Sequence, residues 1–280
     1  MIHEIGERVF DNAFKNREAK SGDLFLVYQG DGVLAREDSE HLWYPSFADF
    51  EKERPELKDD ARYLFSIDDI HYFRVTDDGL GETDGWTFVQ VDRFRTDMKY
   101  WRAYAGAVGW QLDRWYRDQS FCSRCARPMN HSHKERMLYC DSCGFQAYPK
   151  ISPCVIVAVC DGDRMLLTKY ARRAYSKYSL VAGFVEIGET LEQAVHREVM
   201  EEVGLKVKNL TYYKSQPWPF SDTILAGFFA QLDGSDLVTL QEEELVLGTW
   251  VNREDVPHDE LKISLTGEMM DAFRLNKVSF

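Results

Sequence analysis

The chain has 280 residues and a formal net charge of −13, and 44% of its residues are hydrophobic. This length is enough for two domains, or for one domain with an appended module, each with its own core. An excess of negative charge repels polyanions such as RNA, so a phosphate-bearing substrate needs local cations or metal ions. Small nucleotides therefore fit better than duplexes.

No stretch approaches the roughly 18 apolar residues that a membrane span requires. The first residues, Met1-Ile2-His3-Glu4, lack the basic and apolar blocks of a signal peptide. Four of the six cysteines form two C-x-x-C pairs, which is typical of a metal site in a reducing compartment rather than of disulfides. We therefore expect a cytoplasmic protein without a membrane segment.

The first 95 or so residues are expected to form short strands, separated by acidic and glycine-rich turns. These strands are predicted at Leu24–Tyr28, Leu64–Ser66, Tyr72–Val75 and Trp86–Val91. We find no chemical motif in this part. From about Asp97 to Arg117 the apolar spacing becomes helical, and its stripe consists of Tyr104, Ala107, Val108, Leu112 and Trp115. This helix is expected to lead into the cysteine module.

The cysteine module consists of Cys122-x2-Cys125 and Cys140-x2-Cys143, with 14 residues between the pairs. Two such pairs can supply four thiolates to a tetrahedral zinc ion, so the spacing predicts a zinc ribbon. Because the protein fills all four positions, the zinc is expected to be structural. The cysteines complete the shell without His131 and His133, which we interpret as surface residues. Zinc ribbons often bind nucleic acid, which keeps a nucleic-acid-binding module open as an alternative.

After Pro149 the pattern changes to apolar strands with one strongly amphipathic helix. Cys154–Val159 and Met165–Lys169 are expected to form a hairpin, with Cys154 and Cys160 in a buried strand. Further strands are predicted at Tyr178–Ala182, Leu210–Lys214, Thr223–Leu232 and Thr249–Asn252, with a closing helix near Thr266–Leu275. Mixed strands around a central helix indicate an α+β fold with α/β/α layers.

The helix that follows Gly183 carries its own start and stop signals. Thr190 and Gln193 are spaced as a capping box, and Gly204 suits the left-handed position after the last turn. The apolar residues that repeat every fourth position are Leu191, Val195, Val199 and Val203, which predicts a buried stripe.

Glu198, Glu201 and Glu202 are spaced to lie on one face of this helix, near its carboxyl end. Like charges at this spacing destabilise a helix by about 0.2–0.5 kcal/mol per pair, and the helix dipole adds a similar penalty. A bound Mg²⁺ or Mn²⁺ reverses these terms, because hard cations take carboxylate oxygens and bridge to phosphates. The spacing therefore favours a metal site, whereas a bare Glu-x-x-Glu-Glu is more often a solvated acidic face.

The triplet lies within a longer pattern, G-x5-E-x7-R-E-U-x-E-E-x-G-U, in which U is aliphatic. Its members are Gly183, Glu189, Arg197, Glu198, Val199, Glu201, Glu202, Gly204 and Leu205. This segment resembles the Nudix box of the Nudix hydrolases without a departure. The resemblance implies divalent cations bound by Glu198, Glu202 and the carbonyl of Ala182, with help from Glu201. It also implies an ion pair between Glu189 and Arg197 that orients the helix, and a metal-activated water that attacks a diphosphate.

A second motif, Ser215-Gln216-Pro217-Trp218-Pro219-Phe220, follows the box. Its two prolines stiffen the backbone and present two aromatic rings, which suits a heterocyclic base, although such rings are also common in a core. With the cysteine module before the box, it resembles the NADH pyrophosphatase branch of the family. The resemblance implies cleavage of NADH or NAD⁺ into nicotinamide mononucleotide and AMP, a homodimer, and NAD-cap removal from RNA. A broader dinucleoside or ADP-ribose pyrophosphatase remains an alternative.

The resemblance also implies residues that contact the substrate. These are Glu135, Tyr148, Phe184, Gln216, Pro217, Trp218, Pro219, Phe220, Ser221, Asp222, Thr223 and Thr266. A distal acid near Trp250 completes the metal set in this family; Glu244 is our choice, with Glu243 as the alternative. Ser221 replaces a third proline of the usual motif, which leaves the preference among dinucleotides open.

The domain organisation predicted from these motifs has three parts. Residues 1–96 form a small β-rich domain, residues 97–148 the linking helix and zinc ribbon, and residues 149–280 a Nudix α/β/α sandwich with a mixed sheet.

Another hypothesis is a nucleic-acid-binding module with a vestigial Nudix box. The intact glutamates argue against it.

Overall fold

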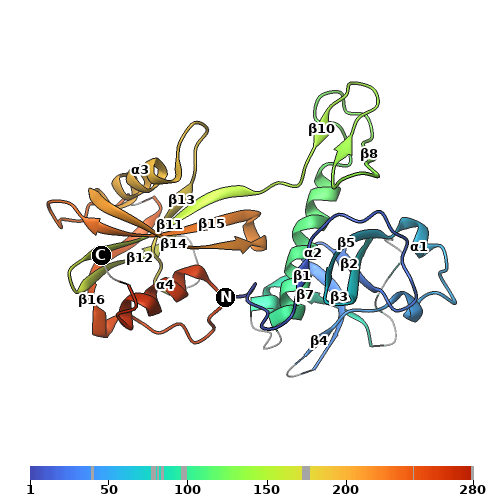
Figure 1. Ribbon diagram of the computed structural model, residues 1–280, viewed down its shortest axis with the longest axis horizontal. Coiled ribbons are helices and arrows are strands. Elements are labelled where there is room, and N and C mark those ends of the chain that lie inside the picture. The colour runs from blue at the N-terminus through green and yellow to red at the C-terminus, as the bar shows by residue number, and fades with distance from the viewer. Residues whose placement is uncertain are drawn as a thin grey trace. The chain divides into compact units, whose positions relative to one another are not determined.

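The computed structural model describes residues 1–38, 41–76, 80, 82, 85–95, 100–171, 177–241 and 243–278 (Figure 1). The chain divides into two compact units. The C-terminal unit contains Met1 and residues 151–218 and 222–280, and the N-terminal unit contains residues 2–150 and 219–221. Our finer division at residues 96 and 148 stays a prediction. Within the described ranges, no helix combines the length and apolar character needed to cross a membrane.

A mixed sheet forms the centre of the C-terminal unit. Its strands follow the order β14-β15-β11-β12-β16, and β13 pairs with the first half of β11. The β11–β15 pair is parallel and the others are antiparallel. The strands are β11 (Ser152–Asp161), β12 (Arg164–Tyr170), β13 (Val181–Phe184), β14 (Val207–Trp218), β15 (Thr223–Leu232) and β16 (Leu245–Asn252).

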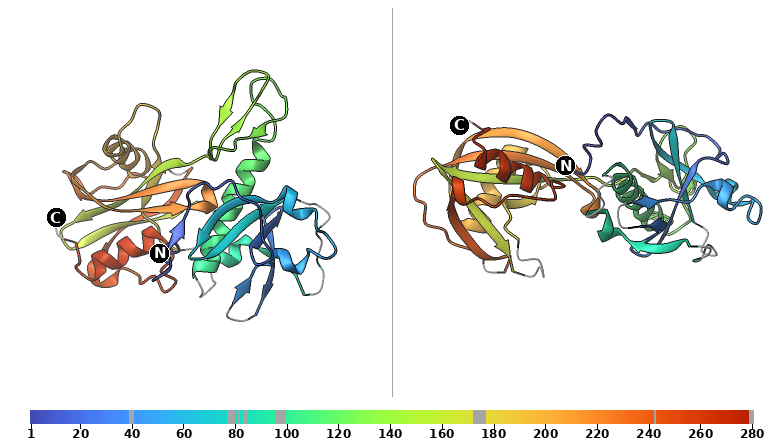
Figure 2. Two further views of the ribbon diagram at one scale, coloured as in Figure 1. Left: turned by 45° about the vertical axis from the view of Figure 1, so that its right-hand side comes forward. Right: turned by 90° about the horizontal axis from the view of Figure 1, so that it is seen from below.

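Two helices cover the two faces of this sheet, as Figures 1 and 2 show, and β11 contributes to both cores. Val155, Val157 and Val159 pack in one core with α3 (Leu191–Val203). The alternate residues, which include Ile156 and Cys160, pack in the other core with α4 (Leu265–Arg274). The two-residue period of a strand explains this division, and the α+β fold with α/β/α layers is confirmed.

Most predicted elements of this unit are confirmed. The predicted hairpin is present, and its turn is at Gly162. Both Cys154 and Cys160 are buried in β11. Strand β15 has the predicted bounds. The strand predicted at Tyr178–Ala182 is wrong in position, because regular pairing with β11 begins only at Val181. Before it, Ser179 forms only an isolated bridge with Thr168.

The N-terminal unit contains a sheet in the order β1-β5-β6-β2-β3-β4, to which β7 is added through β3. Its strands are β1 (Phe10–Asp11), β2 (Leu24–Gln29), β3 (Gly32–Glu37), β4 (Leu42–Trp43), β5 (Arg62–Ile67), β6 (Ile70–Val75) and β7 (Thr87–Gln90). The short elements η1 (Phe47–Asp49), α1 (Leu57–Asp60) and η2 (Val91–Arg95) connect them. The four predicted strands are confirmed, whereas β1, β3 and β4 were not expected.

The predicted bridging helix is α2 (Tyr100–Asp118), whose whole predicted stripe is buried. Residues 97–99 of the prediction lie outside the described residues. The helix packs closely on the sheet at two glycines: a Cβ at Gly109 would lie 2.4 Å from Leu26, and one at Gly106 would lie 2.2 Å from the Tyr44 hydroxyl. Inside this interface Arg74 forms a buried ion pair with Asp113, at 2.7 Å.

The zinc ribbon follows α2 and belongs to the N-terminal unit. Its three short strands pair in the order β10-β9-β8. They are β8 (Asn130–His131), β9 (Leu138–Tyr139) and β10 (Gln146–Ala147). Arg136 anchors the ribbon to the larger sheet, because its guanidinium donates to the side chain of Asn12 at 2.7 Å and to the carbonyl of Leu64.

Candidate functional site

Helix α3 begins and ends as its sequence predicts. The Thr190 hydroxyl accepts from the Gln193 amide at 3.2 Å, and the Gln193 side chain accepts from the Thr190 amide at 2.8 Å, which completes the capping box. Gly204 ends the helix in the left-handed conformation, with φ 68°. Val195, Val199 and Val203 are fully buried. These contacts fix the rotation of the helix and therefore the directions of its glutamates.

Gly183 leaves space for the Glu198 carboxylate. Strand β13 lies beside β11 with Gly183 opposite Val155. A Cβ atom at Gly183 would lie 1.9–2.1 Å from the carboxyl carbon and both oxygens of Glu198. The first glycine of the motif is therefore required by the close approach of a helix side chain to the strand, and this approach places the Glu198 carboxylate beside the Ala182–Gly183 backbone.

Arg197 holds the loop and the helix together. Its Nε and Nη2 donate to the two oxygens of Glu189 at 2.6 and 2.9 Å, the bidentate geometry that a guanidinium favours. Nη2 also donates to the Phe184 carbonyl at 2.8 Å, and Nη1 donates to Glu198 at 2.7 Å and to Glu201 at 3.0 Å. Hydrogen bonds from Arg197 and from the Glu186 amide lower the pKa of Glu189 to about 2. Glu189 thus stays ionised and orients Arg197, which in turn orients Glu198.

Glu202 lies deeper than the other two glutamates. Its side chain is 1% exposed, and neither carboxylate oxygen meets a partner at full hydrogen-bond geometry among the described residues, although the Ala182 backbone lies close enough to lower its pKa. Burial, together with the negative charges of Glu198 and Glu244, raises its pKa to about 8. Burial also raises the pKa of Glu198, and Arg197 opposes this effect. Two buried acids that repel each other are an unfavourable arrangement without a cation.

The donor set fits a hard divalent cation. Carboxylate oxygens are the ligands that such cations prefer, and a buried carboxylate with both oxygens unpartnered is the group that a cation would satisfy. Glu198 and Glu202 would hold the cation, and the Ala182 carbonyl lies on the same strand segment as Gly183. Glu201 is about half exposed and makes one ion pair, with Arg197. A cation bound there would neutralise a diphosphate and lower the pKa of a bound water.

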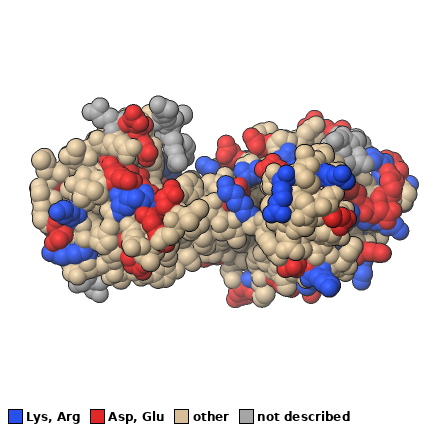
Figure 3. Space-filling model, turned by 90° about the horizontal axis from the view of Figure 1, so that it is seen from above, with Lys and Arg blue, Asp and Glu red and all other residues tan. Residues whose placement is uncertain are grey.

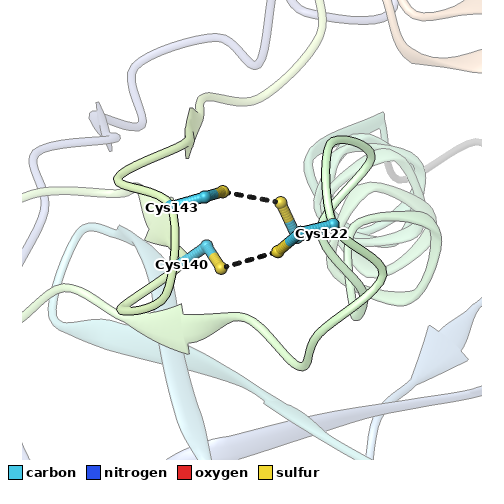
Figure 4. Close-up of side chains that lie close together, drawn as sticks. Cys122, Cys140 and Cys143 are labelled. Atoms are coloured by element: carbon cyan, nitrogen blue, oxygen red, sulfur yellow. Dashed lines mark hydrogen bonds between the residues drawn. The ribbon is translucent and has the colours of Figure 1, made fainter.

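The four cysteines of the ribbon come together in one group, and Figure 4 labels three of them, Cys122, Cys140 and Cys143. The Sγ atoms of Cys122 and Cys143 are 3.5 Å apart, as are those of Cys125 and Cys140, and all four lie within 4.8 Å of one another. Zn–S bonds of about 2.3 Å in a tetrahedron place the sulfurs about 3.8 Å apart. The geometry therefore supports a structural zinc with no open coordination position.

The two cysteine pairs have equivalent backbones. The amide of Ala126 donates to the Cys122 carbonyl at 2.8 Å, and the amide of Gly144 donates to the Cys140 carbonyl at 2.9 Å. Both residues are left-handed, with φ of 58° and 70°. The ribbon thus uses glycine in one turn and accepts a strained alanine at the same place in the other.

The ribbon also holds two residues that were expected to contact substrate. The Tyr148 hydroxyl donates to Glu135 at 3.4 Å, and Tyr148 is 53% exposed.

The interpretation of both histidines as surface residues holds only for His133. His131 is partly buried, its ring lies 5.3 Å from that of Tyr116, and burial next to Arg62 and Arg74 lowers its pKa to about 4. Its apolar neighbours are distant in sequence, so no local pattern indicated this burial.

The predicted substrate loop is divided between the two units. In the C-terminal unit, Gln216 is fully buried; its amide donates to the Ile263 carbonyl at 2.7 Å and accepts from the Leu265 amide at 2.6 Å. It therefore holds β14 to the start of α4. Trp218, with Pro217 next to it at the end of β14, packs partly against the core of α4.

The remaining predicted residues of this unit lie near the same strand ends. Thr223 is buried at the start of β15, and its hydroxyl donates to the Trp218 carbonyl at 3.5 Å. Asp222 is left-handed, with φ 55°, and its carbonyl accepts from the Ser152 amide. Thr266 is half-buried in the first turn of α4, and Phe184 is 53% exposed at the end of β13.

Pro219, Phe220 and Ser221 form the short helix η3 (Pro219–Ser221), which belongs to the N-terminal unit. There the Arg114 guanidinium donates to the Pro219 carbonyl at 3.0 Å, and the Arg95 guanidinium lies 4.6 Å from the centre of the Phe220 ring. Figure 3 shows that acidic and basic side chains alternate on the visible face of each unit.

Comparison with known proteins gives matches for the two modules. Residues 150–273 match the model of the NUDIX domain, and residues 117–146 match that of the NADH pyrophosphatase zinc ribbon domain. The NAD-capped RNA hydrolase NudC of Salmonella schwarzengrund is 46% identical over 149 residues, which are 53% of this chain and 58% of the relative. The enzyme of the same name from Salmonella typhi is 45% identical over the same shares.

The chain thus spans a little over half the length of the curated relatives it matches. Among solved structures, a NUDIX hydrolase from Nitrosomonas europaea is 22% identical with a TM-score of 0.49, over 56% of this chain and 92% of that chain. By its matches to the two domain models, the chain contains a NUDIX domain, preceded directly by a zinc ribbon of the NADH pyrophosphatase type.

Proposed function

We propose that this protein hydrolyses the pyrophosphate bond of NADH or NAD⁺ and releases reduced or oxidised nicotinamide mononucleotide and AMP. The observation that carries the proposal is the pair Glu198 and Glu202. Both carboxylates are buried and repel each other without a cation, and that of Glu198 lies against Gly183. The NADH pyrophosphatase type of the neighbouring zinc ribbon supports a nicotinamide dinucleotide as the substrate. The catalytic group consists of Glu189, Arg197, Glu198, Glu201 and Glu202.

Each residue of this group has a distinct role. Glu189 fixes Arg197, and Arg197 fixes the rotamer of Glu198 through the 2.7 Å hydrogen bond. Glu198 and Glu202, with the Ala182 carbonyl, provide the oxygens for Mg²⁺ or Mn²⁺. Glu201 is exposed enough to accept a proton from the attacking water, while its ion pair with Arg197 keeps it directed along the same face.

Glu244 is the distal acid that we propose as an additional ligand, in preference to Glu243. Its carboxylate lies close enough to raise the pKa of both Glu198 and Glu202. The residue is exposed and directly precedes β16. Its backbone is fixed, because its carbonyl accepts from the Ala171 amide at 2.8 Å.

The substrate-binding residues remain those of the sequence prediction, with one change of emphasis for Gln216. Both polar atoms of its side chain are hydrogen-bonded to the backbone of residues 263 and 265. Gln216 therefore holds the binding loop in place and does not contact the substrate itself. The residues proposed to contact the dinucleotide are Glu135, Tyr148, Phe184, Pro217, Trp218, Pro219, Phe220, Ser221, Asp222, Thr223 and Thr266. Phe184 is proposed to stack on a ring, since its side chain is exposed at the end of β13.

A second substrate is favoured by the relatives, whose name states that they hydrolyse NAD-capped RNA. The same diphosphate chemistry removes an NAD cap, so we propose this activity as the alternative. The net charge of −13 opposes RNA binding and favours the free dinucleotide. We further propose that the protein is a cytoplasmic homodimer.

The test compares kcat/KM for NADH, NAD⁺, ADP-ribose, dinucleoside polyphosphates and NAD-capped RNA, each with Mg²⁺ or Mn²⁺. We expect cleavage of NADH or NAD⁺, with loss of activity in Glu201→Gln and full activity in the control Glu192→Gln, which changes a glutamate in the first turn of α3. Absence of dinucleotide cleavage, or an active Glu201→Gln variant, would refute the assignment. Light scattering of the purified protein tests the dimer.

A further inference from the structure

The N-terminal unit contains a pocket of about 610 Å³, whose lining shares Glu135 with the proposed substrate-binding residues. It lies between the segment around Lys15, the turn from α1 into β5, the end of α2 and the first half of the ribbon. Small-molecule sites typically have volumes of about 300–1,000 Å³. The pocket is therefore large enough for a mononucleotide.

The charges that line the pocket differ from those of the chain. The lining has four permanent cations, Lys15, Arg17, Lys58 and Arg62, and three carboxylates, although the chain as a whole carries −13. Lys15 is paired with Asp11 at 2.6 Å, and Arg17 with Asp23 at 2.7 Å. These two cations are compensated by carboxylates outside the lining, so the other two cations stand against the lining carboxylates Glu18, Asp59 and Glu135.

Lys58 and Arg62 are different. Among the described residues, neither forms an ion pair with a carboxylate, and the Arg62 guanidinium donates only to the carbonyls of Asp59 and Ala61. The two residues are four positions apart, on α1 and at the start of β5. Within the described ranges, neither charge is taken up by an ion pair, although Arg62 lies close enough to Asp60 to lower the pKa of that carboxyl, and both can bind an anion that enters the pocket.

The pocket also offers aromatic surface. Tyr63 lines it with its ring, while its hydroxyl is buried and interacts with Lys15. His131, Tyr116 and Tyr139 supply rings for a planar base. Burial, together with the positive charges of Arg62 and Arg74, lowers the pKa of His131.

We propose that this pocket binds a nucleotide, with its phosphate held by Lys58 and Arg62 and its base against the rings of Tyr116, His131 and Tyr139. The site lies outside the NUDIX domain, and its test does not depend on the proposed hydrolysis. A neighbouring pocket of about 430 Å³ shares Arg62, Tyr116 and His131 with it, which leaves room for a substituent on the nucleotide.

The test uses the full-length protein and a readout that is resolved by residue. Lysines are acetylated at a low level, and the extent at each one is measured by mass spectrometry with AMP, adenosine or inorganic phosphate. We expect AMP to protect Lys58 in a saturable manner and adenosine not to protect it. Inorganic phosphate should need a concentration about tenfold higher than AMP for the same protection, which corresponds to about 1.4 kcal/mol of binding free energy from the nucleoside. Lys52, an exposed lysine of the same unit outside the pocket, is the internal control.

Two variants test the anchor residues. Arg62→Gln is expected to raise the AMP concentration for half-protection of Lys58 about tenfold, whereas the control Arg93→Gln, an exposed arginine outside the lining, leaves it unchanged. Because Arg62 is half-buried, the exposed Lys58→Gln provides an independent test, in which AMP protection of Lys15 is followed. Each pocket variant is expected to keep the kcat/KM for NADH.

Three results would overturn the proposal. These are full acetylation of Lys58 at millimolar AMP, equal protection by adenosine or by inorganic phosphate, and unchanged half-protection in both pocket variants. Loss of NADH hydrolysis in the unmodified protein would refute the proposed function and leave these binding results unaffected.

Discussion

Replacement of Gly183 by alanine tests whether the position of the Glu198 carboxylate determines activity. The added Cβ would lie 1.9 Å from the carboxyl carbon, whereas ordinary contacts begin at 3.4 Å. The carboxylate must therefore move by about 1.5 Å, or β13 must move away from the helix. A displacement of about 1 Å in a catalytic group can lower the rate about 100-fold. We expect kcat/KM for NADH to fall by about this factor in Gly183→Ala.

The assay measures kcat/KM and the Mn²⁺ concentration for half-maximal activity in Gly183→Ala. The control is Gly22→Ala, because a Cβ at Gly22 meets no atom within 4 Å. Circular dichroism and thermal unfolding establish that both variants fold. If folded Gly183→Ala kept the kcat/KM and Mn²⁺ dependence of the unmodified protein, the position of Glu198 behind this glycine would not matter and the reasoning would be wrong.

Three further predictions concern charge, zinc and packing. The raised pKa of Glu202 means that the unfolded chain loses this proton near pH 4.5 and the folded chain near pH 8, so stability without metal falls as pH rises between these values. Urea unfolding in EDTA should show that the free energy of unfolding falls by on the order of a few kcal/mol across this pH window, and Glu202→Gln should remove this fall. If the free energy of unfolding of the variant depended on pH as before, Glu202 would not be the source of the dependence. In the ribbon, Gly144→Ala should destabilise the zinc-bound fold by about 1 kcal/mol, and Ala126→Gly should stabilise it. The rate at which a chelator releases zinc measures both effects, and equal rates in the two variants would contradict the left-handed turns. Gln216→Ala leaves the groups of Ile263 and Leu265 unpaired and should cost about 2–4 kcal/mol in urea unfolding, whereas a loss below 1 kcal/mol would argue against the buried hydrogen bonds.

Elements with strong local signals could be predicted from the sequence. Helix α3 has a capping box, a glycine stop and an apolar stripe, and all three are present in the structure. Strand β15 is mostly apolar between Ile224 and Ala230 and has the expected bounds. The helix period also fixes which face Glu198, Glu201 and Glu202 share, whereas the approach of Glu198 to Gly183 depends on how α3 packs against β13.

Features that depend on contacts between distant segments could not be predicted. Strand β13 starts later than its own apolar pattern suggests, because the partner β11 determines where pairing begins. The nucleotide pocket of the N-terminal unit combines residues near 15, 60 and 131, and no spacing rule connects them. The burial of His131 and the two hydrogen bonds of Gln216 arise in the same way. Only the tertiary structure brings these groups together.

The central claim is that Glu202, whose buried oxygens have no partner at hydrogen-bond geometry among the described residues, is a metal ligand of a dinucleotide pyrophosphatase. The most direct measurement is a calorimetric titration of Mn²⁺ into the unmodified protein and into Glu202→Gln, followed by product analysis with NADH. The account predicts Mn²⁺ binding that weakens at least about tenfold in the variant, and formation of AMP and reduced nicotinamide mononucleotide only by the unmodified protein. Equal Mn²⁺ affinity in the two proteins, or undiminished AMP formation by Glu202→Gln, would contradict it.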